Sequence, residues 1–136
     1  MTTLRLRRVN GFSLIEILIV IVIMGILAAI AIPMYLHQRE KARDANAREG
    51  GRTIAIATQI YILESDDEEQ AAPPIADKGT LTPTYLDLKD WPQNMHAQRD
   101  MQIGDGDGDY DYERTDSARR FTITVHLAAA DDFIVP

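Results

Sequence analysis

The stretch FSLIEILIVIVIMGILAAIAI, residues 12–32, decides the fold of this chain. Its 21 residues contain one ionisable side chain, Glu16. A helix of that length extends about 32 Å, the thickness of the hydrocarbon core of a bilayer. The leader LRLRRVNG, residues 4–11, is basic, so the positive-inside rule predicts a cytoplasmic amino terminus and a carboxyl domain on the other side of the membrane.

Glu16 is the anomalous residue of this run. A carboxylate inside a membrane span costs roughly 2.5–3.5 kcal/mol, so it normally has a specific partner. A secretory signal peptide with a cleavage site such as residues 29–31 explains the basic leader, but not the length of the run or Glu16. A plain single-pass anchor explains length and orientation, and again leaves Glu16 without a role.

The junction between Gly11 and Phe12 leads to a third interpretation. Residues 7–16, RRVNGFSLIE, resemble the leader and cleavage site of the type IV pilin family, which includes the pseudopilins of type II secretion. The resemblance implies that a membrane prepilin peptidase cuts after Gly11 and that the new terminal Phe12 is N-methylated. The apolar helix then stays on the mature protein and packs against other copies in a helical filament, which an inner-membrane assembly platform builds.

Glu16 gains a partner in this interpretation. After cleavage, the amine of Phe12 is a cation with a pKa of about 8, four residues before Glu16. The resemblance implies that Glu16 neutralises the amino terminus of a neighbouring subunit, which would make the charge a register device, because only one depth of insertion pairs it. The alternative is that Glu16 reaches its own Phe12 amine or the lipid headgroups.

Gly25 and Pro33 are the expected weak points of the apolar helix. Proline removes a backbone hydrogen bond and can kink a helix, and Pro33 stands where the family commonly has a proline. Small residues let membrane helices approach closely. The resemblance implies that the helix loosens between Gly25 and Pro33 in a filament, whereas the simpler interpretation of Gly25 is an ordinary membrane-helix glycine.

Composition limits what the rest of the chain can be. Of 136 residues, about a hundred remain for a soluble part, which is enough for one modest core. The net charge is −7, or −10 without the three arginines of the leader, and this argues against a nucleic-acid surface. No cysteine is present, so a domain outside the cytoplasm must be held by packing or by a metal. No catalytic constellation is visible, and His37, His96 and His126 are each expected at the surface, so an enzyme is not indicated.

Residues 34–64 continue the apolar run with a polar, helix-forming pattern. Mixed charges near its start favour a helix, as does the helical spacing of Ala57, Ile60 and Leu63 or Glu64 near its end. We therefore expect one long helix that begins in the membrane span and ends as an amphipathic, domain-facing helix.

Two segments interrupt this pattern. The pair Gly50-Gly51 costs about 2 kcal/mol of helix propensity, so either a hinge or a break is expected there, or the helix continues in spite of it. The run SDDEEQAAPP, residues 65–74, is interpreted as a solvated loop rather than as a cation site.

The remaining chain is expected to form a β-rich head. Phe121–Leu127 alternates apolar and polar residues as a half-buried strand does, with Tyr110–Arg114 as its partner and Phe133–Val135 as an edge strand. Trp91, the single tryptophan, is expected to anchor the core. The fold class is therefore α+β and pilin-like, with one long helix packed on a small antiparallel sheet. Its parts are a leader over 1–11, a transmembrane and filament-core helix over 12–33, an amphipathic helix over 34–64 and a head over 65–136.

The segment GDGDGDYD, residues 104–111, is the candidate site in the head. Calcium prefers several oxygen ligands on a flexible loop, and the candidate ligands are Asp105, Asp107, Asp109 and Asp111. The segment is not an EF-hand, because the sixth position is Tyr110 instead of glycine and the twelfth is Asp116 instead of glutamate. The resemblance implies a structural calcium in some relatives, commonly in another loop. The alternative is a solvated turn that joins two strands.

Two classes of function follow. The first is a pilin-like structural subunit that forms a homopolymer, sits in the inner membrane before assembly and ends in a periplasmic or cell-surface filament. Within this class, the small head without disulfides and the loop at residues 90–92 favour a major pseudopilin of type II secretion over a pilus subunit. The second class is a membrane-anchored module that binds calcium or another ligand and never polymerises.

Overall fold

A computed structural model describes residues 11–64, 72–73, 75–114 and 120–136 of the chain. The described residues fall into two compact units, one up to His37 and one from Gln38 to Pro136. One helix, α1 (Leu14–Glu64), contributes to both units. The leader up to residue 10 and most of the predicted acidic loop at 65–74 lie outside the described residues.

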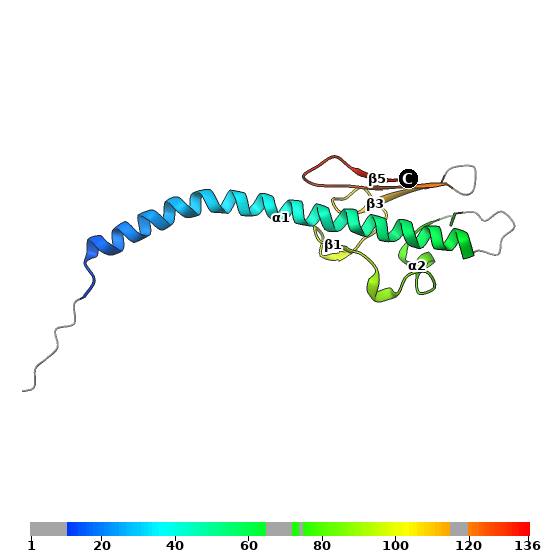
Figure 1. The fold of residues 1–136 in the computed structure, drawn as a ribbon, viewed down its shortest axis with the longest axis horizontal. Helices are drawn as coiled ribbons and strands as arrows, with labels where there is room; N and C mark the ends of the chain where they lie inside the picture. Colours follow the sequence, from blue (N-terminus) through cyan, green and yellow to red (C-terminus); the bar gives the residue numbers. More distant parts are fainter. Residues whose placement is uncertain (1–10, 65–71, 74, 115–119) are drawn as a thin grey trace, which may run out of the picture. The chain divides into compact units, whose positions relative to one another are not determined.

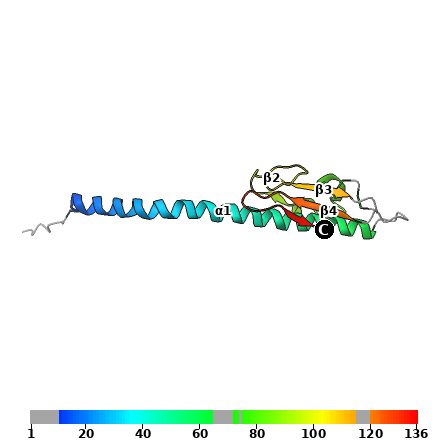
Figure 2. The same ribbon diagram turned by 90° about the horizontal axis from the view of Figure 1, so that it is seen from above.

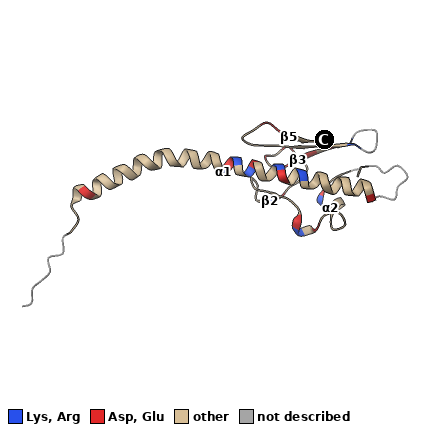
Figure 3. Cartoon of the chain, in the orientation of Figure 1, with Lys and Arg blue, Asp and Glu red and all other residues tan. Residues whose placement is uncertain are grey.

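The part of α1 in the first unit is apolar on every side. Figure 3 shows it without charged positions except for one acidic position near its start. All its residues from Leu14 to His37 are exposed. A helix that is hydrophobic all round normally lies in a membrane or among other helices, and this one is long and apolar enough to cross a membrane. The expectation of an apolar helix of spanning length is confirmed by length and composition.

In the second unit, α1 is continuous through Gly50 and Gly51. Both glycines are buried because the head approaches the helix most closely there. A Cβ added at Gly50 would lie 2.3 Å from Met101 Sδ, and one added at Gly51 would lie 2.3 Å from Val125 Cγ2. The pair is therefore neither a hinge nor a break in this structure, since tertiary packing compensates for its low helix propensity.

The buried face of this part of the helix is lined by small residues and one large one. Ile54, Ala55 and Thr58 recur at helical spacing on that face. The predicted Ala57 is buried and Ile60 half-buried, but Leu63 and Glu64 are exposed. Those two fall outside the stripe because one turn beyond Thr58 the helix presents residues 61 and 62 to the head, and both pack there.

The head carries two small sheets beside α1. Figures 1 and 2 show the strands gathered along the second half of the helix. The strands are β1 (Gln93–Asn94), β2 (Arg99–Asp100), β3 (Tyr110–Arg114), β4 (Phe121–Val125) and β5 (Phe133–Val135), with the short helices α2 (Lys78–Leu81) and η1 (Leu88–Asp90) before them. One sheet has the order β3-β4-β5 and the other pairs β1 with β2, and both are antiparallel.

The predicted three-stranded pairing is confirmed. In the register, Tyr110 pairs with Val125, and Thr124 pairs with Ile134. Strand β4 alternates buried and half-buried residues, as the sequence predicts for a strand with one face on a core, although it ends two residues earlier than expected. The α+β, pilin-like layout is therefore present in the structure.

The core lies between the second half of α1 and the sheets. Trp91 is buried, as predicted, and its indole Nε1 donates a hydrogen bond to the carbonyl oxygen of Met101 at 3.1 Å. Tyr110 is fully buried, and its hydroxyl donates to the carbonyl oxygen of Ala76 at 2.7 Å. The indole N–H and the phenol hydroxyl are both hydrogen-bonded although the rings are buried. Both aromatic residues therefore anchor the core without leaving an unpaired polar group. Other large side chains that are almost completely buried are those of Ile54, Leu81, Met101, Ile123 and Val125, and Phe121 and Leu127 are buried as well.

Candidate functional site

The junction between Gly11 and Phe12 lies just before the helix. Residues 11–13 are exposed and not helical, and α1 begins at Leu14. The backbone amides of Glu16 and Ile17 both donate to the carbonyl oxygen of Ser13, which starts the first turn. A protease needs an accessible, non-helical substrate, and the predicted cleavage site has this form.

Glu16 lies in the first turn of α1, where a carboxylate is favourably placed against the helix dipole. Its side chain is exposed, and among the described residues no hydrogen bond or ion pair is recorded for it. Gly25 is also exposed, and a Cβ there would meet no atom within 4 Å. The helix runs without interruption through Gly25 and Pro33, so their loosening in a filament stays a prediction.

The exposed apolar surface of the first unit is the largest chemical feature of the molecule. It consists of large aliphatic side chains on every face of the helix, all of them exposed. Monomeric soluble proteins rarely expose a contiguous apolar surface of this kind. This surface therefore needs a membrane, other helices, or each in turn.

The four aspartates of the segment 104–111 are not equivalent. Asp105 and Asp107 are exposed, while Asp109 is only 3% exposed. Asp111 lies on β3, and its Oδ2 is 3.2 Å from Nε2 of His126, the residue that follows β4. Among the residues that the structure describes, no group of three His, Cys, Asp or Glu side chains is arranged to hold a metal ion.

Asp109 is held by donors from three sides. Its Oδ1 accepts hydrogen bonds from Asn94 Nδ2 at 2.9 Å, Arg99 Nη1 at 2.9 Å and the Gln102 amide at 3.1 Å. Its Oδ2 accepts from Arg99 Nη2 at 2.5 Å, so the guanidinium forms a bidentate pair with the carboxylate. Burial alone raises the pKa of Asp109, but the hydrogen bonds from Arg99, Asn94 and Gln102 outweigh it and hold the pKa below the usual value.

This arrangement does not suit a calcium ion. Calcium takes six to eight oxygen ligands at once. The most buried candidate carboxylate is already engaged by N–H donors, and the other three are exposed or paired elsewhere. The described geometry thus offers no set of converging oxygens at this segment, and calcium there stays a prediction.

Asp44 is a buried carboxylate that the sequence pattern did not single out. It lies on α1 and accepts hydrogen bonds from the amides of Ala128 and Ala129 at 3.2 and 3.0 Å. Its Oδ1 is also 3.2 Å from Nε2 of His96. The residue therefore ties the helix to two separate loops of the head. The one available signal was its position, three residues before Ala47 and seven before Gly51, on the face that small residues line.

Two of the three histidines differ from the expectation. His37 is exposed as predicted, but His96 and His126 are only half-buried. His126 lies between Asp111 and Asp132, with its Nδ1 3.0 Å from Asp132 Oδ2. His96 and His126 thus both pair with carboxylates of segments that are distant in sequence. The sequence alone cannot show these histidine–carboxylate pairs, because the two partners come together only in the folded head.

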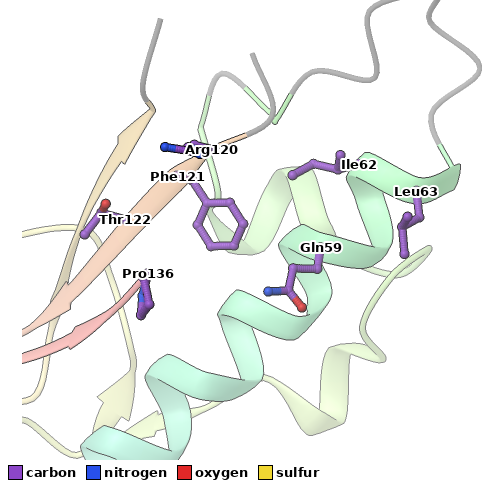
Figure 4. Close-up of a pocket in the computed structure, with 7 residues that line it drawn as sticks. All are labelled: Gln59, Ile62, Leu63, Arg120, Phe121, Thr122 and Pro136. Atoms are coloured by element: carbon purple, nitrogen blue, oxygen red, sulfur yellow. The ribbon is translucent and has the colours of Figure 1, made fainter. Parts of the chain in front are cut away.

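One hollow of about 700 Å³ lies at the far end of the head, between α1 and β4. Figure 4 shows Gln59, Ile62 and Leu63 on the helix side of it, opposite Phe121 and Thr122. Its lining is mainly apolar and holds no cluster of titratable groups. Arg120, one of its lining residues, is next in sequence to residues outside the described ranges, so the hollow carries no functional argument.

Known proteins are similar to this chain over part of its length. The family model described as the prokaryotic N-terminal methylation motif matches residues 6–32. The core protein G of the type II secretion system from Dickeya chrysanthemi is 31% identical over 98 residues, which cover 68% of this chain and 61% of that protein. The protein of the same name from Pseudomonas aeruginosa is 39% identical over 59 residues, covering 43% and 42%. The type IV narrow pilus major component PilA5 of Thermus thermophilus is 54% identical over 58 residues, covering 43% and 50%.

These matches are partial. The chain aligns with 42–61% of the length of the first relatives. No solved structure matches it significantly. The matched motif nevertheless contains Arg7 and Arg8 of the leader, the Gly11-Phe12 junction and Glu16. The chain therefore carries the prokaryotic N-terminal methylation motif and is a homologue of type II secretion core protein G and of type IV pilins.

Proposed function

We propose that the chain is a structural subunit of a helical filament, assembled through packing of its amino-terminal helix. The observation that carries this proposal is the first half of α1, whose large apolar side chains are all exposed in the single chain. The head has a buried core of its own, which is formed by residues from Ala47 onward. Copies of the helix packed side by side would bury the surface and leave the acidic heads outside.

Before assembly, the same surface requires a lipid environment. Its length suits the hydrocarbon core, and the basic leader favours a cytoplasmic amino terminus. The subunit would then wait in the inner membrane as a single-pass protein, with its head on the other side. Transfer from lipid to filament exchanges one apolar environment for another, so we expect the hydrophobic effect to contribute little to that step.

Processing would make the subunit competent for assembly. Cleavage by prepilin peptidase after Gly11 and methylation of Phe12 would leave an amine four residues before Glu16. Because an unpaired charge in an apolar environment is costly, pairing of Glu16 with the amine of a neighbouring subunit would favour one axial position of the helix. The exposed junction and the exposed Glu16 support this sequence of events.

Mass spectrometry and a matched pair of variants test the proposal. In cells with a prepilin peptidase, the mature protein should lack residues 1–11 and carry one added methyl group. Glu16→Ala should be processed normally but yield few filaments, and Glu40→Ala, which removes an exposed glutamate beyond the apolar stretch, should assemble normally. An intact leader would contradict the processing step, and a normal filament yield from Glu16→Ala would contradict the register role. An intact protein that stays monomeric would indicate the membrane-anchored module instead.

The longest of these alignments favours a secretion pseudopilus over a surface pilus, while the match to core protein G of Pseudomonas aeruginosa covers the same share of the chain as that to PilA5. The match to core protein G of Dickeya chrysanthemi covers 68% of this chain, more than the leader and α1 together can supply, so it includes head residues. The match to PilA5 covers 43%, which those two parts alone can supply. Deletion of the gene should therefore impair protein secretion and leave surface pili in place. Loss of pili with normal secretion would favour the pilus subunit.

A further inference from the structure

The loop between β2 and β3 is closed by its own backbone. The amide of Gly104 donates to the carbonyl oxygen of Tyr110 at 3.0 Å, and the amide of Tyr110 donates to that of Gln102 at 3.1 Å. Two further bonds join the loop to the end of β4, from Gly108 to His126 and from His126 to Asp109, at 2.8 and 3.0 Å. The loop is thus neither a freely solvated turn nor a chain that waits for a ligand to order it.

Asp109 points from this loop into the head, where its charge must be compensated. A buried carboxylate without a counter-ion is strongly destabilising. Arg99 supplies the counter-ion, since both nitrogens of its fork reach both oxygens of Asp109. Arg99 Nη1 also donates to the carbonyl oxygen of Asp100 at 2.9 Å, which fixes the fork on its own strand.

Asn94 completes the same connection from the neighbouring strand. Its Nδ2 donates to Asp109 Oδ1 and to the carbonyl oxygen of Asp107, and its Oδ1 accepts from the amides of His96 and Ala97. The side chain is itself buried. The β1–β2 hairpin and the aspartate loop are therefore held together through one carboxylate and its donors.

We propose that the Arg99 guanidinium is the built-in structural cation of this loop, so that the head folds without calcium. A divalent ion at Asp109 would have to displace a guanidinium and an amide that already point at both oxygens. The remaining aspartates do not converge on a second position, because Asp105 and Asp107 face solvent and Asp111 pairs with His126. The chain has no cysteines, and the Arg99 guanidinium would hold the loop in place as a disulfide or a metal does in other proteins.

Trp91 fluorescence can report unfolding of this region, because Trp91 is the single tryptophan and is hydrogen-bonded to Met101, two residues beyond Arg99. The full chain in detergent micelles is melted with Trp91 fluorescence as the signal, in calcium and in the chelator EGTA. The wild type should melt at the same temperature in both. Arg99→Gln should melt lower by roughly 5–10 °C, because it leaves the Asp109 charge buried without its counter-ion. The loss should not be larger, because the Arg99 side chain is itself partly exposed to solvent.

Lys89→Gln is the matched control, because it breaks an exposed pair with Asp87 and should melt like the wild type. Arg99→Lys keeps the charge but loses the bidentate hydrogen bonds, so its melting temperature should lie between those of Arg99→Gln and the control. If Arg99→Gln does not fold, Arg99→Lys can be compared with the control in its place. A wild-type melting temperature that rises with calcium would overturn the inference. So would an Arg99→Gln or an Arg99→Lys melt equal to that of Lys89→Gln. The result does not depend on whether the chain polymerises.

Discussion

The two halves of α1 belong to one helix and have opposite surroundings. Up to His37 the helix is built from large aliphatic residues, and all of them are exposed. From Gln38 the helix is polar, and its buried positions are mostly small, such as Ala47, Gly50 and Ala55. The half with the larger apolar side chains is therefore the exposed half, and the half with the smaller ones contributes to the core of the head.

This difference shows that hydrophobicity and packing within the chain are separate properties. The second half gains stability by close approach to the head, for which small residues are needed. The apolar surface of the first half suits an environment of lipid or of other helices. Gly25 and the Gly50-Gly51 pair express the same contrast, because an added methyl group meets nothing at the former and meets Met101 or Val125 at the latter.

The largest expected effect comes from truncating the same residue type in each half. Ile54 is 0% exposed and Ile19 is 51% exposed. Ile54→Ala should reduce the free energy of unfolding of the head by about 2–5 kcal/mol, because it leaves a cavity. Ile19→Ala should leave it unchanged. Melting curves of both variants in micelles, followed by Trp91 fluorescence, measure the difference, and a comparable loss from Ile19→Ala would show that the first half does pack on the head.

A smaller effect is expected from methyl groups added to the glycines. Gly50→Ala combined with Gly51→Ala should destabilise the head by roughly 2 kcal/mol, because overpacking costs about 1–3 kcal/mol per site and outweighs a helix-propensity gain of about 1 kcal/mol per site. Gly25→Ala should not change the melting of the head. Urea unfolding of the three proteins provides the comparison. A double variant as stable as the wild type would mean that Met101 and Val125 move aside at little cost.

The smallest effect is expected for a charged pair at the surface of the head. Burial lowers the pKa of His126, but hydrogen bonds from it to Asp132 and Asp111 outweigh this and raise the pKa above its usual 6.5. A raised pKa in the folded state stabilises the protein at pH below 6.5, and this contribution disappears as pH rises through the raised value. It should amount to less than about 1 kcal/mol, since both aspartates are half exposed.

The measurement is the melting temperature of the wild type and of His126→Gln at pH 6 and pH 9. The wild type should exceed the variant at pH 6, and the gap should narrow at pH 9. A gap of the same size at both values would assign the role of His126 to packing instead of charge.

The sequence predicted the helix, the three-stranded sheet and the burial of Trp91, because each depends on a local pattern. Apolar residues in an unbroken run give the helix, and alternation in Phe121–Leu127 gives the strand. The sequence did not predict the burial of Asp44 or the Arg99–Asp109 pair. Those contacts join residues 84 and 10 positions apart in the chain, and no local periodicity records them.

The leader, the junction, Glu16 and the apolar run were determined by the sequence itself, since each is defined by the order of residues along the chain. Tertiary structure decided the head. Only the folded arrangement shows that Gly50 and Gly51 are contact points in a continuous helix, and that one aspartate of the segment 104–111 is buried against Arg99 while its neighbours face water. The physical reason is that a glycine or an aspartate has no fixed role of its own. What surrounds it in space sets whether it is a break or a contact, a ligand or half of an ion pair.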